Sequence, residues 1–285
     1  MKTNHSTNVS RREFLQQAAT GAAGLAIGLG VTGFQNAPGK AKIPVGVELY
    51  SVREECKVDF PGTLAAVAKI GFKGVEFAGY WGRSAKELRK MLDDNGIVAC
   101  GTHTPYETFL PEKIDATIEF NQIIGNKFLI CPSMSARTRN DWIAKAEMFN
   151  GIADKLKPHG MWTGYHSHAQ DYHKVEGETI WDIFFTHTKP EVIMQLDTAN
   201  TAEGGADPVA VLNKYPGRVR SIHIKPFGTG PEAVIGEDKI DWPGVFGFCE
   251  SVGGTKWYVV EHETSSKPVE TLKRTYAALK QLGKV

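Results

Sequence analysis

From Pro44 to the C-terminus, the chain alternates eight times between a short apolar run and a segment with helical spacing. Short apolar runs with few charges are typical of parallel strands that are buried on both faces. The expected strands are 45–50, 74–77, 97–103, 128–131, 163–168, 192–200, 219–225 and 257–263. The expected helices are 63–70, 84–95, 112–124, 141–156, 179–187, 207–215, 243–252 and 268–282. Strict alternation predicts an α/β fold, a single (β/α)8 TIM barrel, with a doubly wound open sheet as the alternative.

Local signals mark the ends of several expected helices. Gly71 follows the first helix as a C-cap would, and Ser84 with Glu87 forms a capping-box pattern at the start of the second. The pair Asn95-Gly96 ends that second helix. No Gly-x-Gly-x-x-Gly follows the first expected strand, which weakens a dinucleotide-binding fold.

The N-terminus carries an export pattern. Ser10-Arg11-Arg12-Glu13-Phe14-Leu15 precedes a weakly apolar, Gly/Ala-rich run over 18–34. Paired arginines before such a run indicate a twin-arginine signal, and an ordinary amphipathic or membrane-anchoring helix is the alternative. The sequence therefore predicts a signal and linker over 1–42 and a catalytic barrel over 43–285. It also predicts a periplasmic protein that uses the twin-arginine export machinery and is either cleaved or retained as a membrane anchor.

Charge and cysteine content narrow the classes of partner. Lys and Arg number 33 against 32 for Asp and Glu, a formal net charge of +1. Nucleic-acid binding normally needs a basic face, so this balance favours a small-molecule partner. The four cysteines form no CxxC pair and are expected to be buried, reduced residues. A homo-oligomer is compatible with this composition.

Four successive expected strands, the fifth to the eighth, end in groups that can bind a metal. These are the pair His166 and His168, then Asp197, His223 and Glu261. His166 and His168 point to the same side of an extended strand, because side chains alternate faces. The carboxyl ends of barrel strands meet at one mouth, so independent structural roles would rarely give four such ends in succession. We expect one divalent ion held by Asp197, His223, Glu261 and one histidine of the strand-five pair, His166 or, as the alternative, His168. A mixed imidazole and carboxylate set suits Mn²⁺ or Zn²⁺, with Co²⁺, Fe²⁺ or Mg²⁺ as further options.

Other polar and aromatic residues fall at the same expected mouth. Lys225 lies two residues after His223, on the same face of its strand. The residues expected to contact a substrate are Glu76, Trp81, His103 and Glu263, with Phe227 as a further aromatic candidate. Each also has a purely structural interpretation, such as a core hydrogen bond, a salt bridge or simple packing.

The ordered motifs resemble a known superfamily. Gly-Tyr-His-Ser-His, Leu-Asp-Thr-Ala-Asn, Gly-Gly-Ala-Asp-Pro-Val, His-Ile-Lys and Val-Val-Glu are similar to those of the xylose-isomerase-like TIM-barrel superfamily, the sugar phosphate isomerase/epimerase group. The resemblance implies one divalent ion held by a Glu, an Asp, a His and a Glu from strands five to eight. Asp197, His223 and Glu261 match the last three positions. The chain departs from the family at strand five, where it offers His166 or His168 instead of Glu.

The resemblance implies a divalent-metal-dependent sugar isomerase or epimerase that removes a proton next to a carbonyl. Glu261 and His168 are the expected bases, and Lys225 is expected to stabilise an oxyanion or donate a proton. A metal-dependent lyase or hydrolase of keto-glycosides is the alternative, because the departure at strand five removes one member of the family's glutamate pair. A carbohydrate-binding protein without catalysis is the alternative of a different class. Export disfavours sugar phosphates as substrates, since such metabolites are kept in the cytoplasm.

Overall fold

The structure, a computed structural model, describes residues 42–285, so the expected export signal lies outside the described residues. Eight parallel strands form the main sheet in the order β8-β5-β4-β3-β2-β1-β10-β9. Their bounds are β1 (Val45–Glu48), β2 (Gly74–Phe77), β3 (Val98–His103), β4 (Phe128–Cys131), β5 (Trp162–His166), β8 (Ile193–Gln195), β9 (Ser221–Ile224) and β10 (Trp257–Val260). The end strands β8 and β9 also meet, because Arg218 accepts from the Met194 amide at 2.9 Å and Leu196 accepts from the His223 amide at 2.9 Å. The prediction of a (β/α)8 barrel is therefore confirmed.

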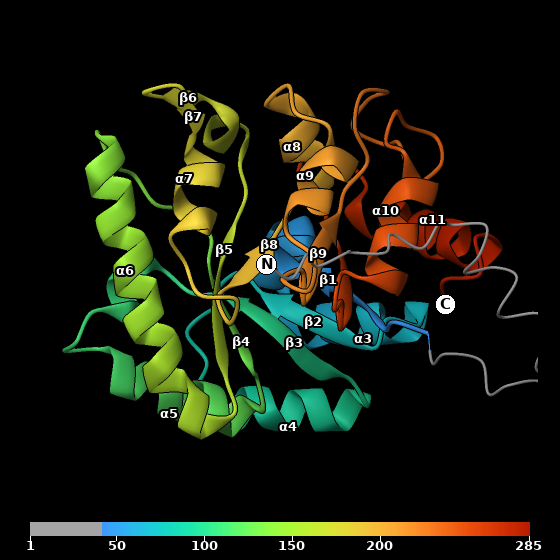
Figure 1. Cartoon of the computed structure of the whole chain (residues 1–285). Coiled ribbons are helices and arrows are strands. Elements are labelled where there is room, and N and C mark those ends of the chain that lie inside the picture. Colours follow the sequence, from blue (N-terminus) through green and yellow to red (C-terminus); the bar gives the residue numbers. More distant parts are fainter. Residues whose placement is uncertain (1–41) are drawn as a thin grey trace, which may run out of the picture. The chain divides into compact units, whose positions relative to one another are not determined.

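Helices surround this sheet, as Figure 1 shows. The α-helices are α2 (Arg53–Val58), α3 (Phe60–Ile70), α4 (Ala85–Asn95), α5 (Ile114–Ile124), α6 (Arg139–Leu156), α7 (Ile180–Thr186), α8 (Thr198–Glu203), α9 (Pro208–Lys214), α10 (Trp242–Ser251) and α11 (Pro268–Gln281). Four 3₁₀ turns, η1 (Leu49–Val52), η2 (Tyr106–Phe109), η3 (Lys157–His159) and η4 (Ala169–Tyr172), and a small hairpin of β6 (Lys174–Val175) with β7 (Glu178–Thr179) complete the described part. Within residues 42–285, no helix has both the length and the apolar character needed to cross a membrane.

The capping signals of the sequence have the expected geometry. The Ser84 hydroxyl accepts from the Glu87 amide, and the Glu87 carboxylate accepts from the Ser84 amide, at the start of α4. Gly96 then ends α4 with a left-handed φ of 63°. Such a cap stabilises a helix by about 1 kcal/mol and here fixes the start of α4.

Strand alternation gives the barrel interior two zones. On β4, Leu129 and Cys131 face the helices, while Phe128 and Ile130 join Ile193 in a separate apolar cluster. Trp162 and Trp257, at the first positions of β5 and β10, pack against that cluster. Because successive side chains alternate faces, the same inward rows continue toward the carboxyl ends with polar residues. The amino-terminal half of the interior is therefore an apolar plug, and the carboxyl half is polar.

Several observed strands are shorter than the runs from which they were predicted, and two of them matter for the site. The run 192–200 forms strand only to Gln195, and residues 198–203 turn into α8. The reason is Asp197, whose side chain accepts from the Asn200 amide at 2.8 Å and caps that helix. The run 257–263 likewise ends as strand at Val260, so the last polar residues of both runs lie in the loops at the mouth.

Candidate active site

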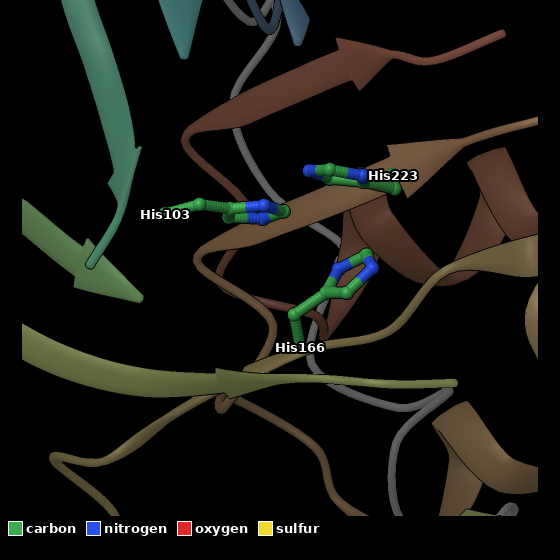
Figure 2. Close-up of side chains that lie close together, drawn as sticks. All are labelled: His103, His166 and His223. Carbon is green, nitrogen blue, oxygen red and sulfur yellow. The ribbon is translucent and has the colours of Figure 1, made fainter. Parts of the chain in front are cut away.

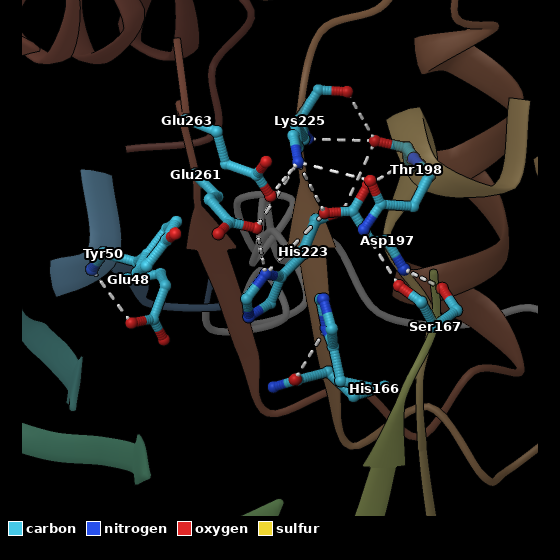
Figure 3. Close-up of polar contacts among 12 residues, drawn as sticks. Glu48, Tyr50, His166, Ser167, Asp197, Thr198, His223, Lys225, Glu261 and Glu263 are labelled. Atoms are coloured by element: carbon cyan, nitrogen blue, oxygen red, sulfur yellow. Dashed lines mark hydrogen bonds and ion pairs between the residues drawn. The ribbon is translucent and has the colours of Figure 1, made fainter. Parts of the chain in front are cut away.

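Four side chains from the ends of β5, β8, β9 and β10 converge at the carboxyl end of the barrel (Figure 3). His166, Asp197, His223 and Glu261 each offer one ligand atom, and these atoms lie within 4.8 Å of one another. His223 Nδ1 is 3.0 Å from Glu261 Oε2 and 3.8 Å from Asp197 Oδ2. All four side chains are buried, with Asp197 and His223 at 0% exposure. The structure thus brings together the four residues that the sequence suggests as metal ligands.

Asp197 shows that this cluster fits a cation. Its Oδ1 caps α8, but its Oδ2 is buried and has no hydrogen-bond partner. Burial raises the pKa of the Asp197 carboxyl to about 7. A buried, unpartnered carboxylate oxygen is costly unless an ion or a proton satisfies it. Two carboxylates and two imidazoles around one point are donors that suit a divalent transition metal.

Gln195 holds two of the histidine rings in place. Its amide nitrogen donates to both oxygens of Glu76 at 3.0 Å, which leaves the amide oxygen to accept. That oxygen lies 3.1 Å from His166 Nδ1 and 3.1 Å from His103 Nε2, so both nitrogens carry the proton. The neutral His166 ring then has its lone pair on Nε2, the ring nitrogen that is free to bind an ion. Burial lowers the pKa of His166 well below its usual value, which keeps the ring neutral.

Glu76 positions the third ring. His223 Nε2 donates to Glu76 Oε2 at 2.6 Å, so His223 Nδ1 faces Asp197 and Glu261. Burial alone would raise the pKa of Glu76, but the His103 charge and the hydrogen bond from His223 lower it. A carboxylate behind a ligating histidine orients the ring and strengthens it as a donor. The prediction that Glu76 contacts substrate stays untested; its observed contacts are to His223 and Gln195.

His103 completes a group of three imidazoles, shown in Figure 2. Its ring stacks on His223 with centroids 5.3 Å apart, and it lies 4.8 Å from the His166 ring. Glu48, at the end of β1, lies beside it, with Glu48 Oε2 3.9 Å from His103 Nδ1. Burial, with the neighbouring Glu76 charge, raises the pKa of Glu48 well above its usual value.

His168 lies outside the four-residue cluster but next to it. Its ring is edge-on to His166 with centroids 5.0 Å apart, and its Nδ1 has no hydrogen-bond partner. The backbone amide of His168 donates to Asp171 Oδ2 at 2.7 Å, which fixes the turn after β5. Burial lowers the pKa of His168, so the ring is neutral near pH 7. It is an imidazole with an available lone pair at the edge of the cluster.

Lys225 and Glu263 form the outer side of the site. Lys225 Nζ lies 2.6 Å from Glu263 Oε1, 3.8 Å from Asp197 Oδ2 and 3.9 Å from Glu261 Oε2. Although burial alone would lower it, Asp197 and Glu261 raise the pKa of Lys225. Lys225 is therefore a positive charge held directly beside the two carboxylates of the cluster.

The two aromatic candidates have different surroundings. Trp81, in the loop after β2, has a positive φ of 48° and packs on Phe60 with centroids 5.1 Å apart. Phe227, in the loop after β9, lines a cavity together with Lys225 and Glu263. A role for Trp81 in substrate binding stays a prediction.

Sequence reasoning missed Gln195 and Glu48. Gln195 lies two residues before Asp197, so strand alternation places it on the same inward face. The signal that could have identified Gln195 is its amide side chain within an otherwise apolar run. Glu48 ends the first expected strand in the same way as Glu76 ends the second.

Comparisons with known proteins agree with this geometry. Residues 64–282 match the model of the family described as xylose isomerase-like TIM barrel. Inosose dehydratase from Geobacillus thermodenitrificans is 24% identical over 249 residues, covering 73% of this chain and 83% of that protein. Inosose dehydratase from Serratia proteamaculans is 26% identical over 247 residues, covering 72% and 82%.

A solved structure of a sugar phosphate isomerase/epimerase from Parabacteroides distasonis superposes with a TM-score of 0.73 at 25% identity. The match covers 86% of this chain and 96% of that one. These similarities support an enzyme of the sugar isomerase, epimerase and lyase class. The chain belongs to the xylose isomerase-like TIM barrel family.

Proposed function

We propose that this protein is a divalent-metal-dependent enzyme that removes a proton beside the carbonyl of a keto sugar and expels a leaving group from the next carbon. The observation that carries the proposal is Asp197 Oδ2, a carboxylate oxygen without a hydrogen-bond partner that is buried among His166, His223 and Glu261. These four residues would hold the ion. When bound, a divalent ion supplies Lewis-acid stabilisation of negative charge on the substrate's oxygens, worth several kcal/mol.

His168 is the base that best fits the geometry. Its ring is neutral and its Nδ1 has no hydrogen-bond partner, whereas Glu261 lies 3.0 Å from His223 and in contact range of Lys225. His168 takes the proton, and the electron pair of the broken C–H bond moves toward the carbonyl. This electron pair then forms a C=C bond as the C–O bond on the neighbouring carbon breaks, and the protonated His168 gives its proton to the departing oxygen. General acid–base catalysis of this kind typically raises the reaction rate by about 10²- to 10⁴-fold.

Lys225 contributes its positive charge to the proposed reaction. Because its pKa is raised, it stays protonated and stabilises negative charge that develops on the substrate. Lys225 Nζ lies 3.8 Å from Asp197 Oδ2 and 3.9 Å from Glu261 Oε2. The ammonium group would therefore act beside the proposed ion rather than in bulk solvent. This role needs no proton transfer from Lys225.

Two observations favour elimination over isomerisation or epimerisation. Two relatives are named inosose dehydratase, and a dehydratase catalyses an elimination. The fifth barrel strand, β5, ends in His166 where the family has a carboxylate. A proton shuttle between two carboxylates therefore lacks one of its members here. One imidazole that both takes and returns the proton suits elimination. Isomerisation or epimerisation is the second candidate, favoured by the superposition on the Parabacteroides distasonis protein.

The test is product analysis with keto-glycosides that carry a chromogenic aglycone, using protein loaded with Mn²⁺ or Zn²⁺. The proposal predicts release of the aglycone and an unsaturated keto sugar, and loss of most of this activity in His168→Ala. His159→Ala is the matched control, because His159 lies in η3 before β5. An isomer or epimer as the product would support the second candidate. Tight binding with no product would indicate a carbohydrate-binding protein.

A further inference from the structure

A cavity of about 310 Å³ opens beside the candidate active site. Three segments line it: the first turns of α8, the loop that follows β9, and the residues that follow Glu261. Asp197, His223 and Glu261 lie directly before these three segments in the chain. The cavity is therefore a continuation of the site along its β8, β9 and β10 side.

Lys225 and Glu263 stand at the border between the cluster and the cavity. Lys225 Nζ contacts Asp197 and Glu261 on one side, and it lies 2.6 Å from Glu263 Oε1 and 3.3 Å from Asn200 Oδ1 on the other. Lys225, Glu263 and Asn200 all line the cavity. A substrate whose reacting carbons lie at the cluster would have its next substituent within reach of this cavity.

The outer wall of the cavity is preformed. The Glu232 carboxylate, in the loop after β9, accepts from the Ser265 hydroxyl at 2.7 Å, the Ser266 amide at 2.7 Å and the Thr271 hydroxyl at 2.7 Å. Arg274 of α11 donates to the Glu232 carbonyl at 2.8 Å. These bonds tie the loop to the segment before α11 and to α11 itself. An anchored loop loses little entropy on ligand binding, which favours affinity.

The charges of the lining select against anions. Its charged side chains are Lys225, Glu203 and Glu263, and Lys225 is already paired with Glu263 and the cluster carboxylates. Apart from Lys225, which lies beside three carboxylates, the lining has no cation to bind a phosphate, and the negative charges of Glu203 and Glu263 repel one. Carboxylates and the Asn200 amide are suited to hydroxyl groups, and the Phe227 ring offers an apolar face to a sugar's C–H bonds.

We propose that this cavity is a subsite for an uncharged, polyhydroxylated second unit, so that the substrate is a glycoside rather than a free or phosphorylated monosaccharide. The second unit is the group that leaves with its oxygen when the bond to the reacting sugar breaks. The volume lies at the lower end of the range of ligand sites, about 300–1,000 Å³, which fits one ring rather than a longer chain. This inference rests on the proposed function for the identity of the reacting ring, but binding to the cavity can be measured without turnover.

The first test is equilibrium binding by calorimetry on the metal-loaded protein. The ligands are a panel of neutral glucose disaccharides, the same disaccharides phosphorylated on one ring, and methyl glucoside. At least one neutral disaccharide should bind about tenfold or more tighter than methyl glucoside and tighter than its own phosphorylated form. Phe227→Ala should remove the advantage of the disaccharide and leave methyl glucoside binding unchanged.

Tyr276→Ala is the matched control, because Tyr276 lines a different cavity with Lys42 and Val285. Melting temperatures of both variants show that each is folded. Equal binding of disaccharide and methyl glucoside across the panel, or tighter binding of the phosphorylated form, would overturn the subsite. Turnover of the matching keto-disaccharide then separates the two claims: if it binds through Phe227 but yields no product, the result supports the subsite and contradicts the proposed elimination.

Discussion

Gln195 is a single side chain that sets the proton positions on the rings around it. Its amide oxygen accepts from His166 and His103, and its nitrogen donates to Glu76, which in turn accepts from His223. The unprotonated Nε2 of His166 and the Nδ1 edge of His223 are therefore the nitrogens available to an ion. Partners behind metal ligands typically change affinity by about 10- to 100-fold when they are removed.

Gln195→Leu should therefore weaken Mn²⁺ or Zn²⁺ binding by about 10- to 100-fold while leaving the fold intact. Gln195→Glu should also weaken it, since a carboxylate at this position repels Glu76 and cannot donate. Equilibrium dialysis of each variant measures this effect. Gln122→Leu is the control, because Gln122 pairs with His159 at the surface. Wild-type affinity in Gln195→Leu would show that the rings are positioned by packing alone.

The same residues predict how ion binding depends on pH. Hydrogen bonds to Glu261 and Glu76 raise the pKa of His223 even though burial would lower it, and burial raises the pKa of Asp197 to about 7. Without an ion, His223 is therefore protonated and Asp197 is partly protonated near neutral pH, and a binding ion must displace these protons. Affinity should rise as pH increases from about 6 to about 8, with proton release. Calorimetry in buffers of different ionisation enthalpy measures the released protons; an affinity independent of pH would contradict these protonation states.

At the scale of elements, a bulge between β2 and β3 aims Glu76 at His223. The pairing runs from Val75 with Ala99 to Glu76 with Gly101, so Cys100 is the extra residue. Gly101 has no side chain at the place where Glu76 passes: a Cβ there would lie 2.0 Å from Glu76 Oε1. The bulge and the glycine together make room for a buried carboxylate that orients a proposed metal ligand.

Gly101→Ala should consequently displace Glu76, destabilise the protein by about 1–3 kcal/mol and weaken ion binding. Gly151→Ala is the matched control, because Gly151 lies in α6 and an added Cβ would meet nothing within 4 Å. That control should be neutral or stabilising, since alanine favours helix over glycine. Chemical denaturation and dialysis measure the two effects. Unchanged affinity in folded Gly101→Ala would show that Glu76 is not needed to orient His223.

The sequence predicted the elements better than their ends. Periodicity identified all eight strands of the barrel because each lies in a short, largely apolar run. It did not show that Asp197 turns the chain into α8, because a capping aspartate and a strand-end ligand look alike in sequence. The same residue does both here, with one oxygen in each role. Gln195 was missed because its role depends on contacts with residues 119 and 92 positions away, Glu76 and His103.

At the scale of the whole molecule, the barrel assembles one polar mouth from segments that span nearly the entire described chain. Glu48 comes from β1 and Glu261 follows β10, and these two strands pair in parallel. The site is complete only when the chain has folded from end to end. Such an enzyme suits a route that carries folded proteins, which is the proposal drawn from Arg11 and Arg12.

Replacing Arg11 and Arg12 together by Lys should therefore leave the protein in the cytoplasm, because the paired arginines are the signal that the export machinery reads. Cell fractionation with an antibody against the barrel measures the distribution. Arg89→Lys with Arg139→Lys is the control, since both lie at exposed ion pairs on α4 and α6. An unchanged periplasmic fraction in the Arg11/Arg12 variant would contradict the twin-arginine assignment.

We propose that His166, Asp197, His223 and Glu261 together hold one divalent ion that supports removal of a proton beside a carbonyl. The incorporation of solvent deuterium into a keto-glycoside in D₂O tests this most directly. NMR measures its rate with three samples: ion-depleted protein, ion-restored protein and the Asp197→Asn variant. Deuterium should appear beside the carbonyl of remaining substrate or in product with the restored wild-type protein. Exchange should be at least about 100-fold slower after depletion, and the variant should not recover it. Equal exchange rates in all three samples would contradict this proposal.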